Sequence, residues 1–185
     1  MTPLSGQTHN GRMSCRPWIS VLLVGLLLGG CSPAFNWRDV RIDDGALVGL
    51  LPCKPDTGER TLPLAGAPVL VHMQGCEAEG MMFTMAAARI PAAGNVSAAL
   101  EAWKAALMAN VRAADTQDRS FIPTGATPLP TSVQARFAGR RADGAPIVVQ
   151  AAFFARGDRV YQAAIFSDKP AGDVAETFFG SLGLR

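Results

Sequence analysis

The sequence predicts an α+β fold in which helices pack on an antiparallel sheet. Three observations support this prediction. Segments with strand character come first, followed by an amphipathic helix, further strands and a final helix. The later strands are separated by two hairpin signals, Asp143-Gly144 and Gly157-Asp158, which favour an antiparallel meander. The predicted helix at residues 95–114 carries one apolar stripe, which is typical of a helix that lies on a sheet.

The first element is a short apolar run near the N-terminus. Arg12 and Arg16 precede it, and the thirteen residues 18–30 are all apolar or Gly apart from Ser20. A membrane-spanning helix needs about 20 residues, so this run is too short. A basic head, an apolar centre and an exit of small residues are the layout of an export signal. Residues 13–31 alone have this layout, so both Met1 and Met13 are compatible with being the first residue of the protein.

The exit of this segment, Leu28-Gly29-Gly30-Cys31, resembles the lipobox of bacterial lipoproteins. The resemblance implies cleavage before Cys31 and lipidation of its thiol and of the new N-terminus. Two or more acyl chains anchor a protein stably, whereas a single chain holds it only marginally. The membrane is therefore an expected partner through Cys31. The alternatives are a buried helix that happens to contain Cys, or a signal cleaved elsewhere.

The residue after the cysteine bears on which membrane is used. An Asp directly after the lipidated Cys would resemble an inner-membrane retention signal, and this chain has Ser32 at that position instead. The outer membrane of a Gram-negative bacterium is therefore expected, with the protein body facing the periplasm. Residues 1–30 are the predicted signal peptide, residues 31–36 a lipidated tether, and residues 37–185 a single α+β domain.

Composition excludes one class of partner. The chain from Cys31 to Arg185 has 155 residues, the size of one domain. Removing Arg12 and Arg16 leaves 15 basic against 15 acidic residues. A neutral domain with scattered basic residues lacks the electrostatic footprint of a nucleic-acid-binding protein, so nucleic acid is not an expected partner.

Cysteine usage fits an oxidising compartment. After removal of the signal and lipidation of Cys31, Cys53 and Cys76 remain as an even pair, which predicts a disulfide in the periplasm. A redox site would more typically be C-x-x-C. A zinc site would need two further ligands, and His72 is the only histidine after residue 31.

Several strands are predicted in the first half of the domain, at residues 37–44, 46–51, 60–64, 69–74 and 81–90. Pro52, Pro55 and the turn residues Asp56-Thr57-Gly58 predict that the chain reverses over residues 52–58. Gly66 and Pro68 mark a bend, and residues 75–80 are expected to form a loop. This arrangement would bring Cys53 and Cys76 to the same end of a sheet, as a disulfide requires.

The helix at residues 95–114 can be capped by Asn95 or Ser97. Its apolar stripe consists of Leu100, Trp103, Leu107 and Val111. The alternative to packing on the sheet is an exposed helix that binds a partner.

The second half of the domain is predicted to be a meander followed by a helix. Residues 115–119 are expected to be a solvated helix exit and residues 120–131 a linker. Strands follow at residues 132–141, 145–156 and 160–167. Pro170 opens a final helix with one apolar face formed by Val174, Phe178 and Leu182.

Three short motifs resemble those of PsbP-like domains. Residues 50–55, LLPCKP, resemble the turn FPGKP that ends an early strand. Residues 153–162, FFARGDRVYQ, resemble the hairpin G-[DN]-R-[LV]-Y-Q, and residues 178–182, FFGSL, resemble the closing helix motif. The resemblance implies an α/β/α sandwich and an accessory or binding protein without catalytic residues. The chain departs from that family in carrying the Cys53/Cys76 pair. In this respect it is similar to proteobacterial lipoproteins with an LLPCKP…GC arrangement.

The sequence predicts no catalytic, cofactor-binding or metal-binding residues. His72 lies in an alternating segment, where a histidine on a sheet face is expected. Asp43-Asp44-Gly45 lacks the ligand spacing and distal Glu of a calcium loop, so turn chemistry is expected there. Tyr161 and the Arg140-Arg141 pair could line a groove, although strand packing and a solvated hairpin also explain them.

Two functional hypotheses follow. The first is a membrane-anchored envelope lipoprotein with a non-catalytic accessory or interaction domain and an envelope protein as its partner. The second is a small-ligand carrier or an enzyme that uses a pocket between the helix at residues 95–114 and the sheet. A deep polar cavity containing His72, Tyr161 or Arg140 would favour the second hypothesis, and a filled core would favour the first.

Overall fold

The structure is a computed structural model that describes residues 2, 34–64, 66–91 and 96–185. The chain divides into two units, Met1–Pro33 and Ala34–Arg185. The predicted signal peptide, the lipidation site Cys31 and the predicted helix cap Asn95 lie outside the described residues. The fold is therefore that of the second unit.

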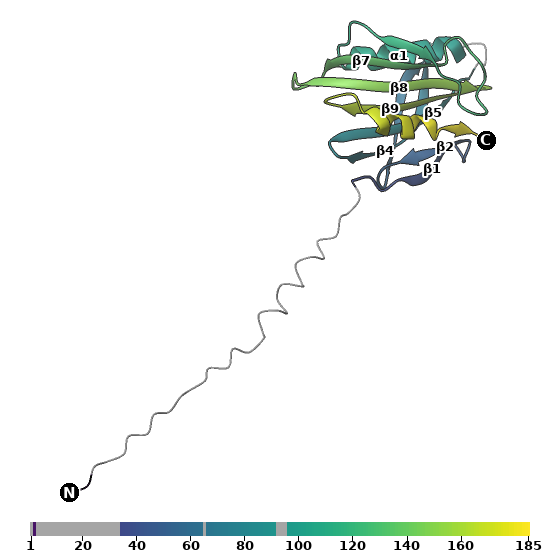
Figure 1. The fold of residues 1–185 in the computed structure, drawn as a ribbon. Helices are drawn as coiled ribbons and strands as arrows, with labels where there is room; N and C mark the ends of the chain where they lie inside the picture. The colour runs from purple at the N-terminus through teal and green to yellow at the C-terminus, as the bar shows by residue number, and fades with distance from the viewer. Residues whose placement is uncertain (1, 3–33, 65, 92–95) are drawn as a thin grey trace. The chain divides into compact units, whose positions relative to one another are not determined.

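The second unit contains ten strands and two helices, arranged around two antiparallel sheets (Figure 1). The larger sheet has seven strands in the order β3-β4-β5-β9-β8-β7-β6, and the smaller one has three in the order β1-β2-β10. The elements are β1 Arg38–Ile42, β2 Leu47–Leu51, β3 Asp56–Leu64, β4 Ala67–Ala78, β5 Met81–Arg89, α1 Val96–Asn110, β6 Gln117–Ser120, β7 Val133–Arg140, β8 Pro146–Arg156, β9 Arg159–Ser167, α2 Gly172–Gly180 and β10 Gly183–Leu184.

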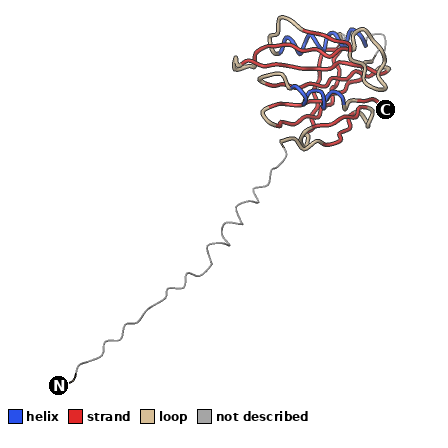
Figure 2. The backbone as a smooth tube through the Cα atoms, viewed as in Figure 1, coloured by secondary structure: helices blue, strands red, loops and turns tan. Residues whose placement is uncertain are grey.

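Both faces of the large sheet are buried, and each face has its own apolar core. Alternate residues of β8 point to opposite faces, so Phe153 belongs to the core under α1 whereas Phe154 belongs to the other core. The second core is covered by α2 together with the small sheet, which contributes Leu47 and Leu51. The two helices, drawn in blue in Figure 2, consequently lie on opposite sides of the large sheet, since each belongs to a different core.

The predicted fold class, helices packed on an antiparallel sheet, is confirmed. The stripe on α1 is buried as predicted, with Leu100 1% and Trp103 4% exposed. Phe178 and Leu182 near the C-terminus are buried against the opposite face. The small sheet was not predicted as a separate layer, because β10 is only two residues long and β1 and β2 resemble strands of the main sheet in their sequence pattern.

The prediction of a turn at Asp56-Thr57-Gly58 is wrong. The chain reverses earlier, over residues 52–55, and Asp56 already begins β3, where it is aligned with Gly75 of β4. The predicted loop at residues 75–80 is likewise too long, because β4 continues to Ala78 and only Glu79 and Gly80 turn. Strand β3 lies at an edge with most side chains exposed. It therefore shows no apolar alternation, and only its backbone pairing with β4 makes it a strand.

A second edge strand, β6, occupies part of the segment predicted as a helix exit and linker. Its four residues are all exposed and pair with residues 133–136 of β7. An edge strand without a buried side chain leaves no signal in the apolar pattern. The rest of the predicted linker, residues 121–131, connects β6 to β7 and hydrogen-bonds to β8 through Thr127 N–H and the Ala155 carbonyl, 2.7 Å apart.

Helix α1 ends at Asn110, four residues earlier than predicted. Arg112 has a left-handed φ of 53°, and the Ala113 N–H donates to the Met108 carbonyl over 3.0 Å. This bond satisfies a terminal helix carbonyl in the manner of a Schellman motif. The motif normally uses Gly at the left-handed position, so Arg112 gave no sequence signal for it. Ser97, a predicted cap, lies in the first turn, where its hydroxyl accepts from the Thr131 hydroxyl at 3.3 Å.

The end of α1 is fixed to β7 by a close backbone contact. The Arg140 N–H donates to the Val111 carbonyl over 2.6 Å, and a Cβ added at Gly139 would lie 2.1 Å from the same carbonyl oxygen. Only Gly allows the two backbones to approach this closely.

We expect Gly139→Ala to lower the free energy of unfolding by about 1–3 kcal/mol, because the backbones must separate. Gly58→Ala is the matched control, since Gly58 also lies in a strand but has no atom within 4 Å of an added Cβ. Urea denaturation should show a change within about 0.5 kcal/mol for the control. Equal stabilities of the two variants would contradict the proposed contact.

Candidate binding site

A group of polar side chains surrounds the turn between β1 and β2. Asp43, Asp44 and Gly45 have consecutive left-handed φ values of 60°, 53° and 87°. Asp tolerates this conformation better than most residues, and Gly does so freely. The Ala46 N–H closes the turn by donating to the Asp43 carbonyl over 3.0 Å. The prediction of turn chemistry at these residues is thus confirmed.

The carboxylate of Asp43 links this turn to the large sheet. One oxygen, Oδ2, accepts a hydrogen bond from Tyr161 Oη at 3.0 Å, and the other, Oδ1, lies 2.5 Å from Arg159 Nη1. Tyr161 and Arg159 both lie on β9, in the middle of the large sheet. The Tyr161 ring is fully buried and stacks on Phe154 with ring centroids 5.5 Å apart. Asp43 therefore connects the two sheets.

The electrostatics of this group fix its protonation states. Burial of Tyr161, followed by its hydrogen bond to Asp43, raises the pKa of the phenol well above its usual value. Tyr161 consequently remains a neutral donor at physiological pH and is unsuited to act as a base. The hydrogen bond from Arg159 to Asp43, with their charge attraction, raises the pKa of the Arg159 guanidinium. The group is a neutralised structural link rather than an acid–base pair.

Two shallow depressions flank the turn. The first, which we call the arginine depression, has a volume of about 580 Å³. Its polar lining consists of Arg41, Asp43, Asp44, Arg156, Asp158, Arg159, Tyr161 and Arg185. The second has a volume of about 530 Å³ and shares Arg41, Asp43 and Asp44 with the first.

The second depression contains His72. Its Nδ1 lies 3.0 Å from Glu59 Oε1 on the neighbouring strand β3, and both side chains are more than half exposed. Nearby, Gln74 Nε2 donates to the Arg41 carbonyl over 3.1 Å, which joins β4 to β1. The position of His72 on a sheet face agrees with the sequence prediction.

The structure brings some of the predicted residues together and separates others. His72 and Tyr161 lie on either side of the β1–β2 turn. Arg140 and Arg141 lie elsewhere, in the β7–β8 hairpin, where Arg140 donates to the Gly144 carbonyl and Arg141 pairs with Asp168 at 2.8 Å. These two contacts agree with the expectation of a hairpin role.

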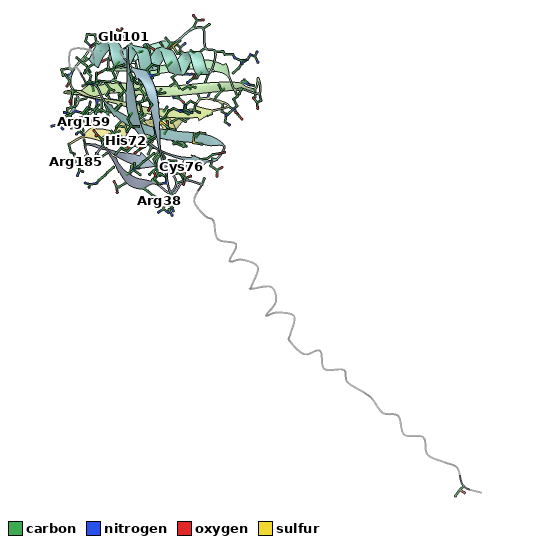
Figure 3. The ribbon with its side chains drawn as sticks, turned by 180° about the vertical axis from the view of Figure 1, so that it is seen from behind. Arg38, His72, Cys76, Glu101, Arg159 and Arg185 are labelled. Carbon is green, nitrogen blue, oxygen red and sulfur yellow. A yellow bond between two sulfur atoms is a disulfide. The ribbon has the colours of Figure 1, made fainter. Side chains whose placement is uncertain are left out.

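Sequence reasoning missed the four arginines of the depression. Arg41, Arg156, Arg159 and Arg185 are contributed by β1, the β8–β9 hairpin and the last residue of the sequence. Their side chains converge only after folding, so the sequence presents them as scattered basic residues. Figure 3 labels Arg159 and Arg185, which lie near each other at this end of the domain, and Arg38, which lies away from them.

The opposite end of β1 holds the N-terminal tether. The rings of Phe35 and Trp37 both pack edge-on against Phe83, with centroids 6.5 and 6.3 Å away. The Asn36 N–H donates to the Pro52 carbonyl over 2.8 Å. From residue 35 onward the predicted tether is therefore part of the folded domain.

Cys53 and Cys76 lie close to this end. Their sulfur atoms are 2.05 Å apart, at disulfide distance, and their Cα atoms are separated by 5.9 Å. Cys53 follows β2 of the small sheet, whereas Cys76 belongs to β4 of the large sheet. A bond between them would tie the two sheets together at the end opposite the Asp43 link.

The space between α1 and the large sheet is filled by apolar side chains. Leu100, Trp103 and Leu107 from the helix meet Phe137, Val149 and Phe153 from the sheet. Neither His72, Tyr161 nor Arg140 lies in this layer. The layer between α1 and the large sheet is therefore a filled apolar core.

Two further properties concern the residues that the structure describes. None of the helices there has the length and apolar character needed to cross a membrane. In the same ranges, no three His, Cys, Asp or Glu side chains are grouped so that they could hold a metal ion.

Comparison with known proteins gives a likeness at the level of solved structures. No protein-family profile matches the sequence, and no curated protein matches it. A similar solved structure is the solution structure of cyanobacterial PsbP (CyanoP) from Synechocystis sp. PCC 6803, with 12% identity and a TM-score of 0.44. The match covers 85% of this chain and 99% of that one. At this identity and TM-score the likeness carries no argument about function.

We expect Asp43→Ala to lower the free energy of unfolding by about 2–4 kcal/mol. The variant leaves the buried Tyr161 hydroxyl without its acceptor and places Ala in a left-handed conformation. Asp44→Ala is the matched control, because Asp44 has a similar φ but no hydrogen-bond partner among the described side chains. Urea denaturation should show a clearly smaller loss for the control, and equal losses would refute the role of Asp43 as a link between the sheets.

The cysteine pair gives a separate prediction. Non-reducing mass analysis of protein isolated without reductant should find Cys53 and Cys76 linked, and two free thiols would disprove the bond. The double variant Cys53→Ser/Cys76→Ser should be less stable by about 3 kcal/mol in the chain-entropy model, as measured against the oxidised wild type by urea denaturation.

Proposed function

We propose that the chain is an exported lipoprotein whose domain is a non-catalytic interaction module in the bacterial envelope. In this proposal the signal is removed before Cys31, the cysteine is lipidated, and the domain stands in the periplasm at the outer membrane. The partner is an envelope protein that contacts the surface around the β1–β2 turn.

One observation carries the anchoring part of the proposal. A basic head and a thirteen-residue apolar segment end at Leu28-Gly29-Gly30-Cys31, immediately before the compact unit that starts at Ala34. This is the order of parts that an exported, lipid-anchored domain requires. The pairing of Cys53 with Cys76 supports an oxidising compartment.

The short tether supports a fixed orientation of the domain. Two residues separate Cys31 from Ala34, so the three Cα–Cα steps between them span at most about 11 Å, and the chain is packed onto the domain from Phe35. The β1–β2 turn lies at the other end of β1, whose five residues extend roughly 15 Å. A lipid on Cys31 would therefore hold the Phe35 end toward the membrane and leave the turn accessible from the periplasm.

The interaction part rests on the kinds of groups around the turn. Tyr161 and Asp43 are occupied in linking the sheets, and both apolar cores are filled by side chains. The groups that remain available are charged side chains in open, shallow depressions. Such a surface suits contact with another macromolecule better than the enclosure of a small ligand.

We expect Cys31→Ala to abolish membrane association, because the thiol that receives the lipid is removed. Globomycin should cause the wild-type precursor to accumulate. Cys15→Ala, which alters the other cysteine of the N-terminal segment, is the matched control and should be processed normally. Membrane fractionation and mass analysis measure both effects. Normal processing and membrane association of Cys31→Ala would exclude lipid anchoring at this residue.

A further inference from the structure

We propose that the arginine depression binds acidic side chains of the partner protein, with Arg41, Arg156 and Arg185 as the contacting groups. This inference rests on the proposed function of the domain as an interaction module. It adds the chemistry of the partner, which must present clustered Asp or Glu residues.

The first step is the balance of charge in the depression. Asp43 is neutralised by Arg159, and Asp158 is bound by Arg89 at 2.6 Å. Among the described residues, the guanidinium groups of Arg41, Arg156 and Arg185 make no ion pair or side-chain hydrogen bond. Asp44 is the remaining carboxylate side chain in the lining. Three unpaired guanidinium groups thus face the Asp44 side chain and the terminal carboxylate of Arg185, which leaves a positive excess of one charge.

The same pairing keeps the nearby acids occupied. The hydrogen bond from Arg89, together with its charge, lowers the pKa of Asp158 below its usual value. In the structure Asp158 is paired with Arg89 and not with Arg41, Arg156 or Arg185. Asp43 is likewise held by two donors, Tyr161 and Arg159.

The second step is the support that the backbone gives to the three arginines. Arg156 and Arg159 are aligned with each other across the β8–β9 hairpin. Arg185 is fixed by its N–H, which donates to the Ala46 carbonyl over 2.9 Å. The Arg41 Cδ lies 3.9 Å from the position that a Cβ on Gly45 would occupy, so its stem lies against the turn. The backbone positions of all three arginines are thus fixed by strand pairing, by a backbone hydrogen bond or by the β1–β2 turn.

The third step is the choice of anion. The planar guanidinium group matches a carboxylate with two parallel hydrogen bonds. An open depression of about 580 Å³ bordered by three separate arginines accommodates several carboxylates on one protein segment. The headgroups of the anchoring membrane are a poorer fit, because the depression lies at the end of β1 opposite the tether.

The test uses full-length protein in detergent micelles and a fluorescein-labelled peptide with six glutamates. Fluorescence anisotropy should show binding that weakens as salt is raised, because the contacts are ionic. Arg41→Gln and Arg156→Gln should each reduce affinity about threefold or more, and the double variant about tenfold. Arg38→Gln is the matched control, since Arg38 is exposed at the other end of the same strand, and it should leave affinity unchanged.

The alternative anions are separated in the same assay. Inorganic phosphate at equal charge and mixed micelles that contain phosphatidylglycerol should compete poorly. Stronger binding of either one than of the peptide would overturn the assignment to an acidic protein segment, as would a peptide that does not bind or an equal loss for Arg38→Gln. Cys31→Ala protein should bind the peptide like the wild type, so failure of anchoring and failure of acidic recognition have different readouts.

Discussion

Burial of the large sheet on both faces is the constraint on which the rest of the structure depends. Strands β5, β8 and β9 carry apolar side chains on both sides, so leaving either face in water would expose a large apolar surface. Helix α1 covers one face, but α2 has only nine residues and cannot cover the other alone. The small sheet completes that cover through residues such as Leu47 and Leu51, and the two sheets thereby become one folded unit.

The position of the candidate binding site follows from this second layer. Because the small sheet lies over the large one, the turn between β1 and β2 comes to the end of β9, where Asp43 meets Tyr161 and Arg159. The buried tyrosine hydroxyl needs an acceptor, and the carboxylate needs a counter-charge, so both requirements are met by one contact. The packing of the small sheet on the large one also brings together arginines that are far apart in the sequence. Structural linkage and a charged surface therefore arise from the same packing.

The parts that the sequence predicted correctly are those with buried side chains. The stripe of α1, the central strand β5 and the hairpin between β8 and β9 each have an apolar period or a turn signal that depends only on neighbouring residues. Strand β6 was missed, and strand β3 was predicted too short. Edge strands expose their side chains and are defined by backbone pairing with distant segments. The candidate site behaves in the same way. Asp43 was recognised as a turn residue, but its contact with Tyr161, 118 positions away, and the convergence of the arginines depend on tertiary structure.

Site-specific photocrosslinking in living cells tests most directly whether this end of the domain is the interaction surface. A crosslinking residue at Ala46, which lines the arginine depression, can be compared with one at Glu101 on the exposed side of α1 (Figure 3). If this end of the domain is the interaction surface, position 46 should give a defined crosslinked product that disappears when Arg41 and Arg156 are replaced by Gln, and position 101 should give none. A product from position 101 alone, or a product from position 46 that persists without the arginines, would contradict it.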